Sequence, residues 1–125
     1  MATPSTASNS GDTLPWTRAY PAGMRWDAEL PVKPVQQMLD EAVERWPERS
    51  AVEFMGQVIT YRELGAAVER AAKGLQDLGV KPGVHVGLYL PNTPHYPIAF
   101  IAVLKAGGTV VNYSPLDAER VLAHK

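Results

Sequence analysis

The sequence has 125 residues, enough for one domain, and its 46% hydrophobic and 20% charged residues are typical of a globular protein. Its formal net charge is −1 and its basic residues are scattered, which argues against a nucleic-acid partner. It contains no cysteine, which excludes a disulfide framework, a zinc–thiolate site and a cysteine nucleophile in this chain and fits a reducing cytoplasm.

The first 30 residues do not read as part of a packed core. Residues 1–13 are rich in Ser, Thr, Ala and Gly without an apolar period, so we expect them to be disordered. Residues 14–30 intersperse aromatic residues with prolines, which indicates either an extended arm on a larger surface or a loosely packed tail. The longest apolar run, 97–104, is far below the roughly 20 residues that span a bilayer, so we expect no transmembrane segment.

The next stretch predicts a helix and a hairpin. Apolar residues from Val35 to Trp46 recur at helical spacing, which indicates an amphipathic helix whose apolar face packs in the core. Residues 51–60 then alternate around Met55-Gly56-Gln57, as in a small β-hairpin.

A second helix follows directly. Thr60-Tyr61-Arg62-Glu63 has the form of a capping box, in which the Thr60 hydroxyl and the Glu63 carboxylate each satisfy a backbone N–H. We prefer this role for Glu63 over a catalytic one. Gly79 stands where a glycine should end the helix.

Residues 79–116 predict a strand, a helix and a parallel strand, which is the crossover unit of an α/β domain. Residues 84–90 alternate, and Gly87 within them suits the close approach of a packed helix. Residues 95–106 form an apolar helix that needs cover on nearly all sides, and residues 109–113 form a strand buried on both faces. Asp117 could cap a last helix.

That last helix runs about two turns to Lys125 without a stop signal. The domain would be small, and its sheet would have open edges. We therefore expect the chain to be the N-terminal portion of a larger α/β domain, divided into 1–30, the disordered start and arm, and 31–125, the α/β segment.

The search for chemistry yields no catalytic, cofactor-binding or metal-binding residue. Lys105 precedes Gly107 and Gly108, so it cannot sit beneath a phosphate at a helix start. Glycines at 79, 83 and 87 lack dinucleotide-binding spacing.

The remaining candidate metal-binding and catalytic residues are better explained by structural roles. His85, His95 and His124 show no metal spacing, although a neutral His95 can cap a helix. Ser114 lacks the flanking glycines of a nucleophile elbow. The carboxylate pairs are interpreted as solvated surface charges; they are Glu48 with Glu53 and Asp117 with Glu119.

Several motifs nevertheless occur together in one order: Ala51-Val-Glu-Phe54, Thr60-Tyr-Arg-Glu-Leu64, Gly79-Val-Lys-Pro-Gly83, Val86-Gly-Leu-Tyr-Leu-Pro-Asn92 and Phe100-Ile-Ala-Val-Leu-Lys-Ala-Gly-Gly108. Over residues 32–125 they resemble the N-terminal region of the adenylate-forming (AMP-forming) acyl-CoA synthetase superfamily. The resemblance implies the large, mixed and parallel-sheet domain of that fold, incomplete in this chain.

Within the superfamily, Val110-Val-Asn-Tyr-Ser-Pro-Leu116 looks like the long-chain fatty acid–CoA ligase group, which carries an Asn-x-x-Pro-Leu pattern. Pro115-Leu116-Asp117 also resembles the start of a peptide-synthetase pattern, but Ala118-Glu119-Arg120 departs from its continuation. Asp117 stands where the fatty-acid group often has an aromatic residue.

The resemblance implies an ATP-dependent acid–thiol ligase that uses ATP, Mg²⁺ and coenzyme A. A carboxylic acid would be activated to an acyl-adenylate and then transferred to coenzyme A, with Mg²⁺ and cationic donors stabilising the phosphates. The phosphate loop and the catalytic lysine of the superfamily lie outside these residues, so we expect the chain alone to be inactive.

The partners implied are the remainder of its own large domain, a fatty acid, ATP and coenzyme A, in the cytoplasm. Peripheral membrane contact and a homodimer stay open. Two alternatives stay open as well: a non-catalytic α/β binding module, and an adenylating enzyme for an amino or aryl acid.

Overall fold

The computed structural model describes residues 15–24 and 28–125, which belong to two units, one ending at Val32 and one covering Lys33–Lys125. In the first unit, Pro15–Ala19 form a short 3-10 helix. The arm expected over 14–30 is therefore not extended at this point, because Pro15 opens a tight helical turn instead. The disorder expected for residues 1–13 lies outside the described residues.

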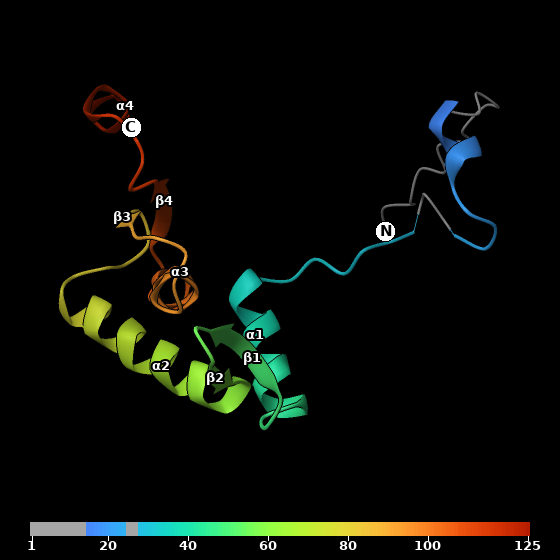
Figure 1. Ribbon diagram of the computed structural model, residues 1–125, viewed down its shortest axis with the longest axis horizontal. Coiled ribbons are helices and arrows are strands. Elements are labelled where there is room, and N and C mark those ends of the chain that lie inside the picture. The colour runs from blue at the N-terminus through green and yellow to red at the C-terminus, as the bar shows by residue number, and fades with distance from the viewer. Residues whose placement is uncertain (1–14, 25–27) are drawn as a thin grey trace, which may run out of the picture. The chain divides into compact units, whose positions relative to one another are not determined.

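The second unit is a mixed α/β segment with four helices and four strands (Figure 1). In chain order they are α1 (Val35–Arg45), β1 (Ser50–Phe54), β2 (Gln57–Thr60), α2 (Tyr61–Asp77), β3 (His85–Tyr89), α3 (His95–Lys105), β4 (Thr109–Tyr113) and α4 (Glu119–His124). The helices and strands predicted from the sequence are all present, with bounds that differ by one or two residues at most places.

The hairpin and the capping box form as predicted. Strands β1 and β2 pair antiparallel, and Met55 and Gly56 connect them with φ values of 50° and 78°. Positive φ at both central residues is the signature of the type I′ turn, whose twist matches that of paired strands. At the end of β2, the Thr60 Oγ1 accepts from the Glu63 N–H at 3.3 Å, and the Glu63 carboxylate accepts from the Thr60 N–H at 2.8 Å.

Helix α2 ends at the predicted glycine. The N–H of Val80 donates to the Leu75 carbonyl and the N–H of Gly79 donates to the Gln76 carbonyl, both at 2.9 Å, while Gly79 has a φ of 94°. These bonds form a Schellman motif, which requires the left-handed conformation that glycine adopts without strain. Helix α3 ends in the same way at Gly107.

Strands β3 and β4 pair parallel, with Val86 opposite Val110 and Tyr89 opposite Tyr113, and α3 forms the connection between them. The predicted crossover unit is confirmed. Figure 1 shows α3 lying between α2 and this pair of strands, in agreement with its contacts to both. The three helices α1, α2 and α3 share one apolar core: Leu39, Leu64, Val68, Ala72 and Ala102.

Two expectations about burial are wrong. Strand β4 is not buried on both faces: none of its residues is fully buried, because α3 packs against one side of the pair. On α1, Leu39 and Ala42 are buried as expected, but Val35, Met38 and Trp46 are exposed. The Trp46 ring instead lies near two guanidinium groups, with the Cζ atoms of Arg45 and Arg49 at 5.1 and 6.0 Å from its centroid.

Gly87 also has a different neighbour from the one expected. A Cβ atom at Gly87 would lie 2.7 Å from Cε2 of Tyr113, so the close approach comes from a side chain on the adjacent strand and not from a helix. Diagonal neighbours on paired strands lie within reach of an aromatic ring, which explains the contact.

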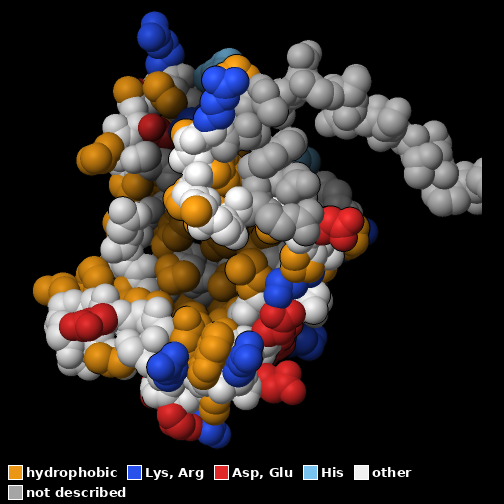
Figure 2. Space-filling view, turned by 90° about the vertical axis from the view of Figure 1, so that its right-hand side faces the viewer, with side chains coloured by type: hydrophobic (Ala, Val, Ile, Leu, Met, Phe, Trp, Pro, Cys, Tyr) orange, Lys and Arg blue, Asp and Glu red, His pale blue; other side chains and the backbone are white. Residues whose placement is uncertain are grey.

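The surface keeps a substantial apolar component. Hydrophobic side chains gather in a hollow on one face in Figure 2. Several of the large exposed hydrophobic side chains come from α1, the hairpin and the turn after β4: Val35, Met38, Met55, Val58 and Leu116. Among the helices in the described ranges, none is long and apolar enough to cross a bilayer.

Candidate binding cleft at the carboxyl ends of the parallel strands

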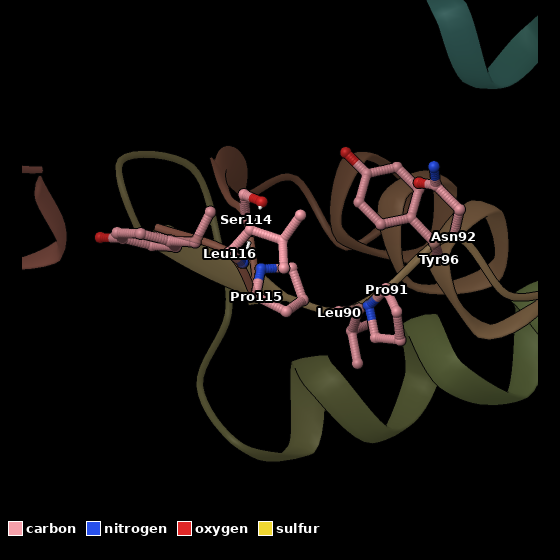
Figure 3. Close-up of a pocket in the computed structure, with 8 residues that line it drawn as sticks. Leu90, Pro91, Asn92, Tyr96, Ser114, Pro115 and Leu116 are labelled. Carbon is pink, nitrogen blue, oxygen red and sulfur yellow. Dashed lines mark hydrogen bonds between the residues drawn. The ribbon is translucent and has the colours of Figure 1, made fainter. Parts of the chain in front are cut away.

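A cleft of about 410 Å³ lies where β3 and β4 end. Both strands run in the same direction, so their exit turns meet at one edge, which is where ligands bind in open α/β sheets. The lining comes from the last residue of β4, the two turns and the first turn of α3: Leu90, Pro91, Asn92, Tyr96, Tyr113, Ser114, Pro115 and Leu116. Figure 3 shows Asn92 and Tyr96 together on one side, and Ser114, Pro115 and Leu116 together on the other.

One hydrogen bond ties the two sides of this edge together. The Tyr96 hydroxyl, on the first turn of α3, donates to Oδ1 of Asn112 near the end of β4 at 2.7 Å. The Tyr96 ring also stacks on Phe100 one turn further along, with 6.3 Å between the centroids. The hydroxyl therefore holds the carboxamide of Asn112 in one orientation.

The turn after β4 is held by its own polar groups. The Leu116 N–H donates to Oγ of Ser114 at 3.1 Å, and the Ser114 N–H donates to Oδ2 of Asp117 at 3.0 Å. The hydroxyl of Tyr89 donates to the Pro115 carbonyl at 3.3 Å. These bonds fix the shape of this wall of the cleft.

Asp117 does not cap the last helix, and this expectation is wrong. The N-cap of α4 is Ala118, whereas the Asp117 carboxylate turns back to the Ser114 N–H and pairs with Nζ of Lys125 at 2.6 Å. The hydrogen bond from Lys125, followed by the one from the Ser114 backbone, lowers the pKa of Asp117. The Asp117 carboxylate is thus engaged by the turn and by Lys125, and not by the N–H groups of α4.

No side chain that lines the cleft carries a formal charge. Its polar groups are two phenols, a carboxamide and a hydroxyl, and the rest is proline and leucine. Such a lining can hold an uncharged part of a ligand by hydrogen bonds and apolar contact. It supplies neither an acid–base pair nor the cations that bind phosphates.

The other candidate residues named from the sequence have structural roles or are exposed. Lys105 ends α3 and pairs with Asp40 and Glu69. Arg62 pairs with Glu48, and Glu53 is exposed on β1. The helix that begins at His95 has Pro94 as its N-cap and no side-chain cap, so the capping role suggested for His95 is wrong.

Sequence reasoning missed the cleft. Asn92 and Tyr96 belong to no catalytic motif, and their neutral side chains carry no charge pattern. The signal that could have found them is topological, because two predicted parallel strands place their exit turns at the same edge.

The cleft has no carboxylate that could bind the Mg²⁺ that the resemblance implies. Over residues 15–24 and 28–125, no group of three or more His, Asp or Glu side chains could hold a metal ion.

Comparison with known proteins decides the family. A family model described as AMP-binding enzyme matches residues 39–124, which include the whole cleft. The chain belongs to the AMP-binding enzyme family.

Relatives in this family come from more than one branch. A long-chain-fatty-acid–CoA ligase of Bacillus subtilis is 33% identical over 111 residues, which is 89% of this chain and 20% of that protein. Bacitracin synthase 1 of Bacillus licheniformis is 36% identical over 101 residues, 81% of this chain and 2% of that protein. The chain thus spans about a fifth or less of the length of the curated relatives it matches.

A solved structure of an AMP-binding relative shows the same arrangement. The N-terminal subdomain of NpsA from Klebsiella oxytoca superposes with a TM-score of 0.71 at 30% identity, covering 74% of this chain and 24% of that one. The resemblance and the α/β fold inferred from the sequence are both confirmed.

Proposed function

We propose that the protein to which this chain belongs is a long-chain fatty acid–CoA ligase. The carboxylate of the acid attacks the α-phosphorus of ATP, which gives an acyl-adenylate and releases pyrophosphate. The thiol of coenzyme A then attacks the acyl carbon and displaces AMP, which leaves the thioester. Adenylation makes this second step feasible because it converts a poor leaving group into a good one.

The match to the AMP-binding enzyme family carries the proposal. The fatty-acid branch is supported by the Bacillus subtilis relative and by the pattern from Asn112 to Leu116. That pattern forms the end of β4 and the turn that lines the cleft.

An adenylating enzyme for an amino or aryl acid is the second candidate. It is favoured by the similarity to Bacitracin synthase 1 and by NpsA, whose N-terminal subdomain has been solved in complex with 3-hydroxyanthranilyl-AMSN. Both candidates share the adenylation step and differ in the acid.

The full-length protein distinguishes the two. Acid-dependent exchange of labelled pyrophosphate into ATP should occur with long-chain fatty acids, and thioester should form when coenzyme A is added. Exchange with amino or aryl acids alone would reject the fatty-acid branch but would still agree with membership of the family. No exchange with any of these acids would contradict the adenylation itself.

Residues 1–125 contribute the scaffold and one wall of a substrate site. The cleft carries no charged side chain, so we assign it an uncharged portion of a substrate and no part in the chemistry. The chain alone should release no pyrophosphate from ATP, and measurable turnover would overturn this assignment.

A bulky residue in the cleft tests its role. In the full-length enzyme, Leu116→Trp should raise the KM for one substrate several-fold, because Leu116 lines the cleft and is 94% exposed. Leu78→Trp is the matched control, since Leu78 is 84% exposed and lies at the end of α2. Equal KM values in the two variants would show that the cleft does not bind a substrate.

We also propose the cytoplasm as the location and the remainder of the large domain as the direct partner of this segment. The homodimer and the peripheral membrane contact stay predictions, which light scattering and vesicle co-sedimentation of the full-length protein would test.

A further inference from the structure

Lys105 occupies the meeting point of three helices. It is the last residue of α3, and its side chain is only 16% exposed. Its Nζ lies 2.6 Å from Oδ1 of Asp40 on α1 and also donates to Oε1 of Glu69 on α2. One ammonium group therefore joins α3 to both other helices of the core.

The surroundings of Lys105 favour its positively charged form. Burial alone would lower the pKa of Lys105, but the hydrogen bonds to Asp40 and Glu69 outweigh it and raise the pKa. A cation at the carboxyl end of a helix is also favoured by the helix dipole. Removal of Lys105 would leave Asp40 and Glu69 without this shared partner.

The apolar contacts of α3 hold it against the core. Its buried residues are Ala102 and Val103, and Ile98 and Ile101 also pack against a core that includes Ala72. Hydrophobic burial has no preferred direction, so polar contacts at the ends of α3 add directional restraint to this packing.

Directional contacts add to this packing. In the part of the chain that the structure describes, the side chains of α3 make them at its two ends: Lys105 with Asp40 and Glu69, and Tyr96 with Asn112. Nine residues separate the two ends, about 14 Å along a rigid helix. A shift at Lys105 is thus transmitted to Tyr96, which lines the cleft.

We propose that Lys105 is a positioning residue for the cleft at the carboxyl ends of β3 and β4: its ion pairs with α1 and α2 set the placement of α3 that lets Tyr96 hold Asn112. Any effect on catalysis rests on the proposed function, whereas the effect on the Tyr96–Asn112 pair does not.

The first test uses the full-length protein, with its Asn and Tyr side chains selectively labelled, and the side-chain NMR resonances of the pair. Lys105→Met keeps the length of the side chain and removes its charge, and it should shift the Asn112 carboxamide and Tyr96 ring signals. Lys105→Arg should restore most of the wild-type positions, since it can pair with both carboxylates. A Lys105→Met protein that is less stable but has unchanged signals would overturn the proposal.

Lys73→Met is the matched control. Lys73 lines the same polar cavity of about 380 Å³ as Lys105, but its pair with Asp77 lies within α2, and both side chains are more than 60% exposed. It should leave the Tyr96 and Asn112 signals in place. Equal shifts from Lys73→Met and Lys105→Met would show a general charge effect and reject positioning.

Asp40→Asn and Glu69→Gln cover the case in which Lys105→Met does not fold. Each leaves one ion pair of Lys105 intact, so each should fold and shift the Asn112 carboxamide in part. Unchanged signals in both variants would contradict the proposal.

The full-length enzyme gives the functional readout. Lys105→Met should raise the KM of the substrate that Leu116→Trp affects, by about the same factor, with kcat changed less. A loss in kcat alone would reject positioning of the cleft, and the absence of activity in the wild-type protein would concern the proposed function only.

Discussion

The ring of Tyr113 covers Gly87 on the neighbouring strand so closely that a Cβ atom at Gly87 would lie 2.7 Å from Cε2 of the ring. Glycine weakens a strand because it has no side chain to pack, and here an aromatic side chain fills the space that it leaves. The same ring lines the cleft, so the backbone of β3 decides where one wall of the cleft lies.

Gly87→Ala should therefore destabilise the chain by about 1–2 kcal/mol, because the ring must move aside. Urea unfolding monitored by circular dichroism measures the change. In a Tyr113→Val background the same substitution should cost much less, since the obstructing ring is gone. An equal cost in both backgrounds would show that the strain lies elsewhere.

Two glycines of α2 should respond to alanine with opposite signs. A Cβ atom at Gly65 would lie 2.7 Å from Cγ2 of Val43, so the close packing of α1 on α2 depends on this glycine. We expect Gly65→Ala to destabilise the chain by about 1 kcal/mol in spite of the gain in helix propensity.

Gly74 is the internal control for that variant. No atom lies within 4 Å of a Cβ placed there, so Gly74→Ala should stabilise the chain by about 0.5–1 kcal/mol. Thermal unfolding of both variants gives the two signs directly. A stabilising Gly65→Ala would mean that α1 does not pack on α2 as described.

The capping box should make stability depend on pH. The hydrogen bond from the Thr60 N–H, followed by the one from the Thr60 hydroxyl, lowers the pKa of Glu63 in the folded chain. A carboxyl with a lowered folded pKa stabilises the fold above its unfolded pKa, and this contribution is lost as the pH falls through the folded pKa.

The difference in unfolding free energy between the wild-type chain and Glu63→Gln should accordingly be largest near pH 6–7 and shrink below about pH 4. Denaturant titrations across that range measure it. Thr60→Ala should cost about 0.5–2 kcal/mol, and adding Glu63→Gln to it should change little, because the cap is already broken. A constant difference across the pH range would contradict the assigned hydrogen bonds.

The hairpin turn offers a stabilising substitution. Met55 has a φ of 50° and is 87% exposed, so its side chain gains little from burial while its backbone is strained. Met55→Asn should raise stability by about 0.5–1 kcal/mol, because asparagine tolerates this conformation and Asn-Gly is the preferred type I′ pair. Met55→Val is the contrasting variant, since a β-branched side chain should be destabilising there.

Local features were predictable from the sequence because each depends on a few neighbouring residues. The capping box at Thr60 and Glu63, the turn at Gly56 and the stop at Gly79 all follow from such short-range rules. The family was accessible for a related reason, since several of these local motifs occur in one order.

Contacts across the fold were not predictable in the same way. The sequence gives no reason why Tyr113 should cover Gly87, or why Asp117 should choose Lys125 over a helix terminus, because these choices depend on distances set by tertiary packing. Lys105 could be excluded as a phosphate ligand because it precedes the glycines of its motif. Its ion pairs with Asp40 and Glu69 could not be predicted, because these residues lie on helices that are distant from it in the sequence. The cleft was missed because its lining is uncharged.

Thr60 is at once the last residue of β2 and the N-cap of α2, so no loop separates strand from helix. The N–H groups of Tyr61 and Arg62 donate to the carbonyls of Arg49 and Pro47, which binds this junction to the segment that follows α1. Inserting a single residue here would turn the hairpin by about 100° around the axis of α2 and break every one of these bonds. We therefore expect length variation among relatives to fall elsewhere, for example at the Met55-Gly56 turn, and to spare this junction.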